Sequence, residues 1–359
     1  MIGPATLPRP RHATADWVQA ALDRQLARGA RAGGEHYRLL LEALSEASSG
    51  GKRLRPQLVL TSFRAMGGEL ERERPPAEVA AVAAAVELLH TAFVIHDDVL
   101  DGDDVRRGRP SAPGRFLADA EASGCAPAQA RAYATAGAVL TGDLALAGAL
   151  RAVATCGAPP EVVARLLDLF EHAVQVSAAG ELADIRFGLG LEVPTLAEAL
   201  TMEEHKTAVY SFALPMQCGA VLAGADESVV ASLGLVGRQL GLAFQLYDDL
   251  LGTFGDPART GKSAGGDLRE GKQTPLVVHA RTSDHWPEIA AHLGDPDLTE
   301  EQAAAVRETL EASGSRAFVQ ALAAGYLQAA LAQAAGLGLD LADVPGLGQL
   351  LTVDDEGAA

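Results

Sequence analysis

The chain has 359 residues, of which 48% are apolar and only 4% aromatic, and its formal net charge at pH 7 is −18. A surface this acidic repels nucleic acid and anionic membranes, which excludes proteins that hold polyanions through their overall electrostatic field. The apolar residues are mainly Ala, Leu and Val, a mixture that favours closely packed helices over a β-sandwich.

The N-terminal part contains a predicted helix and a basic segment. Residues 1–14 are rich in proline and aperiodic, which predicts a frayed lead-in. Helical periodicity then extends from Asp16 to Leu44 and stops at a Ser/Gly-rich break. The sequence Gly-Lys-Arg-Leu-Arg-Pro follows at 51–56 and leads into an apolar helix at 58–66. Such a basic segment is typical of a solvated loop, but in so acidic a chain it is also a candidate anion site.

The next predicted helix, which begins near Pro75, ends in a cluster of carboxylates. It places Asp97 and Asp101 on one face, one turn apart, with Asp98 beside them. Carboxylates so close repel each other unless a cation lies between them, and the absence of nearby cysteine indicates Mg²⁺ or Mn²⁺ rather than zinc. Because Mg²⁺ usually takes one or two carboxylates and completes its octahedron with water and phosphate, the cluster implies a phosphorylated partner. The alternative is a solvated, charged helix end.

Basic residues directly follow this cluster. Arg106, Arg107 and Arg109 come where the helix is expected to end, and guanidinium groups match the geometry of phosphate oxygens. His90 lies two turns before Asp97 on nearly the same face. A lone histidine in an apolar helix is commonly a satisfied core residue, whereas beside a phosphate site it can donate a hydrogen bond.

The middle of the chain is predicted to consist of further helices. Glu181 and Asp184 place acidic residues on one helix face that continues to Phe187. The helices are expected at 128–155, at 162–179 and from Thr195 toward Tyr210, with a bend at Pro215 and a short helix within a loop at 114–127.

A later helix repeats the first acidic arrangement. It extends over 229–247 and leads into an Asp pair, so that Gln245 and Asp249 share a face with Asp248 beside them. Two apolar helices that each end in an Asp pair suit two carboxylate clusters facing across a cavity. The glycine-rich segment at 255–272 is expected to be a mobile flap.

No segment shows convincing strand alternation, so the prediction is an all-α protein of ten to thirteen helices. We expect a single domain over 15–351 and a flexible tail at 352–359. The widely spaced Cys125, Cys156 and Cys218 indicate reduced thiols in a cytoplasmic protein. We expect no signal peptide and no transmembrane helix, because charge or glycine interrupts each apolar stretch before about 18 residues.

Together these motifs resemble those of the trans-isoprenyl diphosphate synthases, also called polyprenyl synthetases. A single motif of this kind is weak evidence, whereas their joint occurrence at these spacings is specific. The resemblance implies a helical bundle of the isoprenoid-synthase type around a central prenyl cavity. It covers roughly residues 35–350 and rests on GKRLRP at 51–56, HDDVLDGDDVRRGRP at 96–110, Lys206-Thr207, FQLYDD at 244–249 and GKSAGGDLREGK at 261–272.

The resemblance also implies a role for each motif residue. The implied ligands of three Mg²⁺ ions, or of Mn²⁺ in their place, are Asp97, Asp98, Asp101, Asp248 and Asp249. The implied contacts to the allylic diphosphate are Arg106, Lys206, Gln245 and Lys262, and Thr207 and Gln245 are implied to stabilise the carbocation. The implied contacts to isopentenyl diphosphate are Lys52, Arg55, His90 and Arg107, and Lys272 is a further candidate for substrate binding.

The chain departs from the family pattern at two places. Gly252 stands where the second acidic motif commonly has a third aspartate, so metal binding there must rely on the Asp pair, with Asp256 able to reach back. Gly180-Glu181 replaces a common Gly-Gln pair, while Asp184 is retained. We expect altered metal affinity at the second motif rather than loss of activity.

The implied reaction is a Mg²⁺-dependent, head-to-tail condensation of isopentenyl diphosphate with an allylic diphosphate, in which the departing diphosphate takes the proton. Phe93 and Leu89 lie about 6 and 12 Å before the aspartates along the helix, and Ala92 beside them is small. This pattern argues against very long tails and favours geranylgeranyl diphosphate (C20), with farnesyl diphosphate (C15) second. The alternative is that Phe93 packs in the core and another helix limits the chain length.

Two other functions share part of this pattern. A class I terpene cyclase also uses an Asp-rich motif with Mg²⁺, but it carries an Asn/Ser/Glu triad late in the chain and needs no second diphosphate site. A non-catalytic subunit of a heteromeric synthase loses aspartates or basic residues, and this chain keeps both. The family also suggests a homodimer.

Overall fold

The structure is a computed structural model that describes residues 18–24, 27, 33–70, 74–255, 266–341, 344 and 347. Its contacts divide the chain into two compact units, which are taken separately below. Unit 1 consists of Met1–Leu60 and Leu70–Pro159, and unit 2 of Thr61–Glu69 and Pro160–Ala359. The described residues form fourteen α-helices and one π-helix of defined bounds, against a prediction of ten to thirteen helices.

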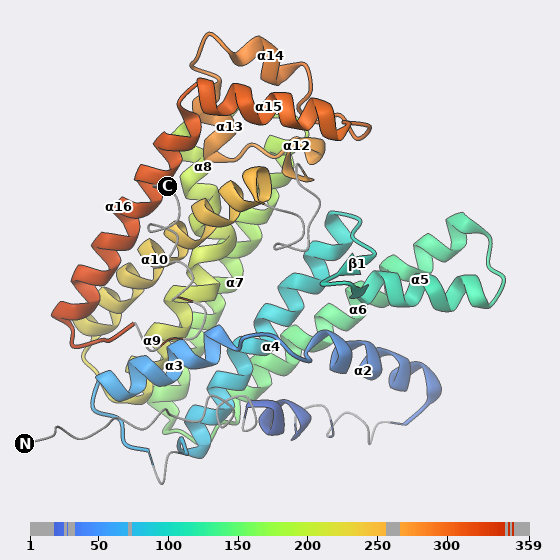
Figure 1. The fold of residues 1–359 in the computed structure, drawn as a ribbon. Coiled ribbons are helices and arrows are strands. Elements are labelled where there is room, and N and C mark those ends of the chain that lie inside the picture. The colour runs from blue at the N-terminus through green and yellow to red at the C-terminus, as the bar shows by residue number, and fades with distance from the viewer. Residues whose placement is uncertain are drawn as a thin grey trace, which may run out of the picture. The chain divides into compact units, whose positions relative to one another are not determined.

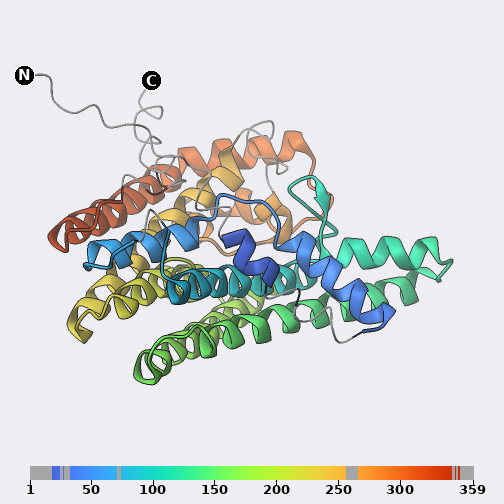
Figure 2. The same cartoon turned by 90° about the horizontal axis from the view of Figure 1, so that it is seen from below.

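Unit 1 is built on two long helices that pack along each other, α4 (Ala77–Leu100) and α6 (Pro127–Ala154) (Figures 1 and 2). The shorter helices α2 (Glu35–Ala47) and α5 (Ala112–Ala122) also pack against α6. Small residues on α6 allow this close approach, because a Cβ on Gly142 would overlap the ring of His96 on α4. The shared core contains Leu44, Ala92, Ile95, Ala112, Ala138 and Ala145. Helix α3 (Leu54–Ala65) begins in unit 1 and ends in unit 2.

Two features of unit 1 correct the predictions. The helix expected from Asp16 to Leu44 is interrupted, because Gly33 and Gly34 have φ of 73° and 103° and α2 begins only at Glu35. Such values suit glycine and do not occur in a right-handed helix. The expectation of no strand is wrong for four residues, since β1 (Val105–Arg106) pairs antiparallel with β2 (Arg109–Pro110). Strands of two residues are too short to show alternation.

Unit 2 is organised around α10 (Glu227–Phe254), which packs against the π-helix η2 (Glu204–Ala213) and α16 (Ser315–Gly336) (Figure 1). Helix α7 (Pro160–Gly188) also packs against η2. Glycines on α10 make this approach possible, because a Cβ on Gly237 or Gly241 would overlap residues of η2. The other helices are α8 (Leu196–Glu203), α9 (Leu214–Leu222), α12 (Gly266–Glu270), α13 (Pro275–Ala280), α14 (Trp286–Ala290) and α15 (Glu300–Ala312).

Two predicted boundaries in unit 2 are also corrected. Helix α7 continues without a break to Gly188, whereas the sequence pattern ended the helix at 179. The segment expected to be too loose for regular structure contains the short helix α12, whose Leu268 side chain is buried. The predicted site residue Lys262 and the alternative ligand Asp256 lie outside the described residues.

Three helices are long and apolar enough to cross a membrane by length and composition, namely α4, α6 and α10. The expectation that no helix has the length and composition to cross a membrane is therefore wrong for these three. The interruptions on which it relied, Glu87 in α4 and the glycines in α6 and α10, do not lower the mean hydropathy enough. Within the protein, between 44% and 72% of each apolar window is buried.

Candidate active site

The first acidic motif lies at the C-terminal end of α4. Asp101 follows the last helical residue, and its N–H donates to the carbonyl of Asp97 at 2.8 Å, so the two aspartates are one helical turn apart as predicted. Arg106 lies against this motif. Its Nη2 donates to Asp97 Oδ2 at 3.0 Å and its Nε donates to Asp98 Oδ1. The guanidinium thus takes the position of a counter-ion between the two carboxylates.

Asp98 is the buried member of this motif, with only 2% of its surface exposed. Burial raises the pKa of Asp98 to about 6, although the charge of Arg106 and its hydrogen bond act in the opposite direction. A buried carboxylate whose charge depends on one cation is suited to bind a further cation, because the added charge removes the cost of ionisation.

The basic residues after the motif are carried by the β1–β2 hairpin. Arg107 and Gly108 form its turn with φ of 53° and 71°, the conformation of a two-residue type I′ turn. This fixes Arg106 opposite Arg109 in the ladder. Ser111 stabilises the hairpin, because its hydroxyl donates to the carbonyl of Asp103 at 2.6 Å.

The residues predicted for a second anion site come together in unit 1. A Cβ on Gly51 would lie 3.4 Å from Nη1 of Arg107, so the 51–56 segment lies directly against the hairpin. Burial, followed by the charges of Arg55 and Arg107, lowers the pKa of His90 well below its usual range. His90 is therefore a neutral imidazole among arginines at pH 7, able to donate a hydrogen bond without adding positive charge. Lys52, which belongs to the same segment, is exposed.

Arg53 has a role that the sequence did not indicate. Only 6% of its surface is exposed, and its Nη1 donates to Glu87 Oε1 on α4 at 2.9 Å. Its Nη2 donates to the carbonyl of Ser48 at 2.8 Å and to Gln19 Oε1 at 2.7 Å. Arg53 therefore fixes the basic segment to α4.

In unit 2 the predicted Lys206 and Thr207 lie on η2, a π-helix, which is a type of helix frequent at functional sites. Lys206 Nζ donates to Asp184 Oδ2 at 2.6 Å and to Glu181 Oε1 at 3.1 Å, both on α7. A Cβ on Gly180 would overlap the backbone N of Lys206, so the glycine is required for this approach. Lys272, predicted to bind substrate, forms an ion pair with Glu270 at 2.8 Å.

The second acidic motif lies near the end of α10, where Asp248 is exposed and Asp249 is buried. Gln245 Nε2 donates to Asp249 Oδ1 at 2.9 Å. Asp249 and Glu203 at the end of α8 are 5% and 4% exposed. Burial, and then the charge of Asp249, raises the pKa of Glu203 well above its usual range. Burial raises the pKa of Asp249 to about 7, although its hydrogen bonds act in the opposite direction. At least one of the two groups therefore holds a proton near neutral pH.

Glu203 is a site residue that sequence reasoning missed. It stands one turn before Lys206, which in a sequence indicates an exposed ion pair along a helix. Its burial arises from tertiary packing in unit 2, which the local sequence does not show. The sequence signal for Glu203 is the pair of acidic residues Glu203-Glu204 shortly before the motif residue Lys206, and this signal is weak.

The buried pair predicts how stability depends on pH when no divalent cation is added. The folded protein holds a proton on Asp249 or Glu203 up to about pH 7, whereas the unfolded chain releases it near pH 4, so stability falls as pH rises between these values. Asp249→Asn keeps the acceptor for Gln245 and supplies a donor to Glu203. We expect it to raise stability by on the order of 2 kcal/mol at pH 8 and to change little at pH 5.

Thermal unfolding at both pH values, with Asp297→Asn on an exposed turn as the control, measures this effect. Equal effects of Asp249→Asn at pH 5 and pH 8 would show that the carboxyl pair is not the titrating element.

The donor set of both motifs fits a hard divalent cation. All ligands offered are carboxylate oxygens, and Oδ2 of Asp249 is buried and accepts no hydrogen bond from the described residues. Among these residues no three His, Cys, Asp or Glu side chains converge closely enough to hold an ion alone. Mg²⁺ does not require this, since water and phosphate complete its coordination. The meeting of the two motifs across one cavity stays a prediction.

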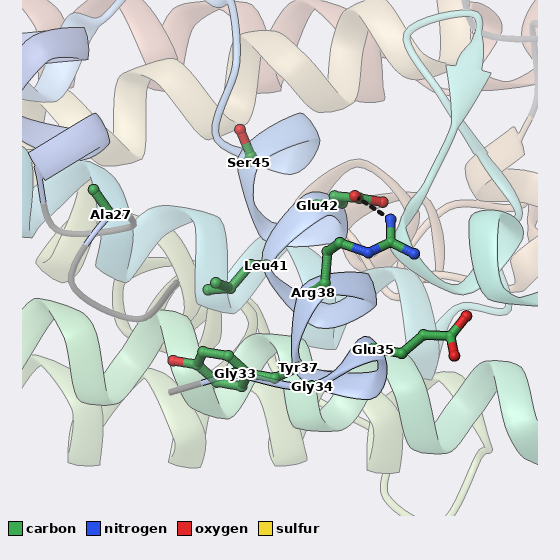
Figure 3. A pocket seen from close by; sticks show the side chains of 9 residues that line it. All are labelled: Ala27, Gly33, Gly34, Glu35, Tyr37, Arg38, Leu41, Glu42 and Ser45. Carbon is green, nitrogen blue, oxygen red and sulfur yellow. Dashed lines mark hydrogen bonds and ion pairs between the residues drawn. The ribbon is translucent and has the colours of Figure 1, made fainter. Parts of the chain in front are cut away.

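Two pockets occur elsewhere. A pocket of about 770 Å³ lies beside α2 and is lined by Tyr37, Arg38, Leu41, Glu42 and neighbouring residues (Figure 3). A smaller one of about 280 Å³ lies between α7 and α8. Neither is lined by a residue predicted to bind metal or diphosphate.

Comparisons with known proteins agree with the motifs. The model of the Polyprenyl synthetase family matches residues 37–310. The short chain isoprenyl diphosphate synthase of Methanothermobacter thermautotrophicus is 34% identical over 79% of each chain. The (2E,6E)-farnesyl diphosphate synthase of Mycobacterium tuberculosis is 33% identical over 80% of this chain and 75% of that protein.

A solved structure extends the likeness to the fold. The geranylgeranyl pyrophosphate synthase of Corynebacterium glutamicum, complexed with isoprenyl diphosphate and magnesium, matches 95% of both chains at 30% identity and a TM-score of 0.82. This confirms the predicted all-α single-domain class. The chain therefore belongs to the polyprenyl synthetase family and is a short-chain isoprenyl diphosphate synthase, a prenyltransferase that joins its substrates head to tail in the trans configuration.

Proposed function

We propose that the chain makes geranylgeranyl diphosphate from isopentenyl diphosphate and an allylic diphosphate in the presence of Mg²⁺. Farnesyl diphosphate is the second candidate, because the relatives include synthases of both products. The observation that carries the proposal is the pair of charged clusters along α4. Asp97, Asp98 and Arg106 lie at its end, and His90, Arg55 and Arg107 gather two turns earlier.

These clusters account for the two phosphorylated substrates. Mg²⁺ bound to the aspartates would stabilise the negative charge that develops on the leaving diphosphate. Arg106 is held between the carboxylates before substrate arrives, so its charge is already in place when the C–O bond breaks. The neutral His90 and the adjacent arginines hold the second diphosphate, so that the double bond of isopentenyl diphosphate is presented to the allylic cation.

Product length depends in this proposal on Phe93, one turn before Asp97 on α4. The side chain of Phe93 keeps partial exposure, whereas Ala92 and Leu89 are fully buried. A bulky, partly exposed ring one turn before Asp97 is in a position to line the path of the growing tail. This supports Phe93 as the limit on the growing tail over the alternative that it merely packs in the core.

Phe93→Ala is expected to lengthen the main product by one or more isoprene units, because one turn of helix extends about 5 Å along the tail. Chromatography of the dephosphorylated products measures the chain length. Val94→Ala, also partly buried and next to Phe93 on α4, is the matched control and should leave the distribution unchanged. An unchanged distribution in Phe93→Ala would assign the limit to another helix.

The deciding experiment incubates the purified protein alone with Mg²⁺, isopentenyl diphosphate and, in turn, dimethylallyl, geranyl and farnesyl diphosphate. A C20 diphosphate from all three starters supports the proposal. A C15 end product indicates the second candidate. A cyclic hydrocarbon made without isopentenyl diphosphate would indicate a terpene cyclase, and no product at all a non-catalytic subunit.

We also propose that the protein is a homodimer. Apolar side chains on α6 stay exposed in unit 1, among them Tyr133, Val139, Leu140 and Leu150. An exposed apolar strip of this kind is typical of a subunit interface. The molecular mass in solution, measured by light scattering, decides between monomer and dimer.

A further inference from the structure

Lys206, an implied contact to the allylic diphosphate, lies between two carboxylates of α7. Its Nζ donates to Asp184 Oδ2 at 2.6 Å and to Glu181 Oε1 at 3.1 Å. The three side chains are between 14% and 23% exposed. Water and salt therefore screen these ion pairs less than they screen pairs on the open surface.

The contact is fixed by the packing of α7 against η2. A Cβ on Gly180 would lie 2.4 Å from the backbone N of Lys206, so the two helices approach as closely as their backbones allow at this point. Glu181 follows Gly180 directly, and Asp184 stands three residues later on the same face of α7. The close approach of the backbones thus places both carboxylates within reach of Nζ.

The second carboxylate changes the charge of this group of side chains. Asp184, which makes the shorter contact, is enough to balance the ammonium of Lys206. Glu181 adds a further negative charge, so that one ammonium and two carboxylates leave a net negative charge. An anion that approaches Lys206 therefore meets repulsion from Glu181 as well as attraction from Nζ.

The size of this repulsion depends on the charge of the ligand. Free diphosphate carries several negative charges, whereas bound Mg²⁺ ions neutralise most of them. Coulomb repulsion is proportional to the charge of the ligand, so Glu181 opposes binding of free diphosphate far more than binding of its Mg²⁺ complex. Because the group is partly buried, this difference is not lost to screening by salt.

We propose that Glu181 is a specificity-determining residue that makes the site at Lys206 select diphosphate with bound metal over free diphosphate. The inference rests on the proposed function, in which an allylic diphosphate binds with Mg²⁺, and on the implied contact of Lys206 with it. Asp184 holds Nζ in place, and Glu181 supplies the charge that excludes the metal-free ligand.

The test measures binding of inorganic diphosphate to the whole protein by isothermal titration calorimetry, once with EDTA and once with excess Mg²⁺. Glu181→Gln keeps an acceptor for Nζ and removes only the charge. We expect it to bind diphosphate about tenfold more tightly with EDTA, and to change binding with Mg²⁺ less than about threefold. Glu171→Gln is the control, since Glu171 lies exposed on α7 and accepts a hydrogen bond from Gln175. It should change neither affinity.

Two further variants complete the test. Glu181→Asp keeps the charge and should stay within about threefold of the unaltered protein in both conditions. Lys206→Gln should weaken binding of the Mg²⁺ complex. An equal gain in both conditions for Glu181→Gln, or no gain with EDTA, would overturn the inference, and so would unaltered binding by Lys206→Gln.

These outcomes are distinct from a failure of the proposed function. If the unaltered protein does not bind diphosphate even with Mg²⁺, the proposed function fails and the role of Glu181 fails with it. If Glu181→Gln does not fold, Glu181→Ala, which also removes the charge, decides in the same two conditions.

Discussion

Replacing Asp98 with Asn is expected to lower kcat about a thousandfold and to leave the protein at least as stable as before. The side chain is 2% exposed and accepts a hydrogen bond from Arg106 Nε. Asn keeps the size of the side chain but removes the charge that, in the proposed function, holds Mg²⁺ and Arg106 around the leaving diphosphate. The substitution removes stabilisation of the negative charge that develops on the leaving diphosphate in the transition state. We therefore expect kcat to fall far more than KM rises.

Stability should move in the opposite direction from activity. Burial raises the pKa of Asp98 to about 6. At pH 8 the carboxyl group is ionised in both states, but ionisation costs more free energy in the folded protein than in the unfolded chain, which lowers the stability. Asn removes this cost, and Tm at pH 8 without added Mg²⁺ should stay equal or rise. Such opposite effects on stability and activity are expected where a site is strained for function.

The control is Asp119→Asn on α5, which is exposed and accepts a hydrogen bond from Tyr133 at 3.0 Å. It removes one carboxylate from the same unit and should retain activity. Steady-state kinetics and thermal unfolding of both variants give the comparison. A kcat within about tenfold of the unaltered enzyme in Asp98→Asn would remove Asp98 from the metal-binding set.

The sequence predicted the helices that carry the two motifs because their signals are local. Helix α4 contains a long apolar run that ends at Asp97 and Asp98. Helix α10 contains a similar run that leads to Asp248 and Asp249, although the helix continues to Phe254 where the sequence predicted an end at 247. Periodicity alone therefore placed both Asp pairs next to long apolar helices. The type I′ turn at Arg107-Gly108 was missed, although a glycine at its second position permits it. Two strands of two residues each are too short for sequence periodicity to indicate.

The features that sequence reasoning did not find depend on close approach between distant segments. From the sequence alone, charged residues such as Arg53 and Glu87 are expected at the surface. Both are buried because the 51–56 segment folds over α4. Glu203, at the end of α8, is 4% exposed although it stands one turn before Lys206. Asp267 reaches α10 only because residue 252 has no side chain. In each case a charged residue is enclosed by tertiary packing, which local propensity does not encode.

Arg53→Met is expected to reduce the free energy of unfolding by about 3–5 kcal/mol, because it leaves the carboxylate of Glu87 buried without its cation. Both residues are 6% exposed, and the Nη1–Oε1 distance is 2.9 Å. Glu87→Leu should cost a similar amount, and the double variant Arg53→Met/Glu87→Leu should recover most of the loss, since an apolar pair needs no partner charge. Urea denaturation measures each variant.

The matched control is Arg38→Met, which removes one member of the exposed Arg38–Glu42 pair on α2 and should cost less than about 1 kcal/mol. Because Arg53 fixes the segment that carries Lys52 and Arg55, the double variant should be stable again and yet bind isopentenyl diphosphate less tightly. We expect its KM for isopentenyl diphosphate to rise about tenfold, with a smaller change in kcat. The reason is that the double variant alters the position of the 51–56 segment and leaves the groups around the leaving diphosphate unchanged. If Arg53→Met/Glu87→Leu restores both the stability and the KM, the ion pair contributes only to folding. If Arg53→Met alone is no less stable than Arg38→Met, the ion pair does not hold the 51–56 segment at all.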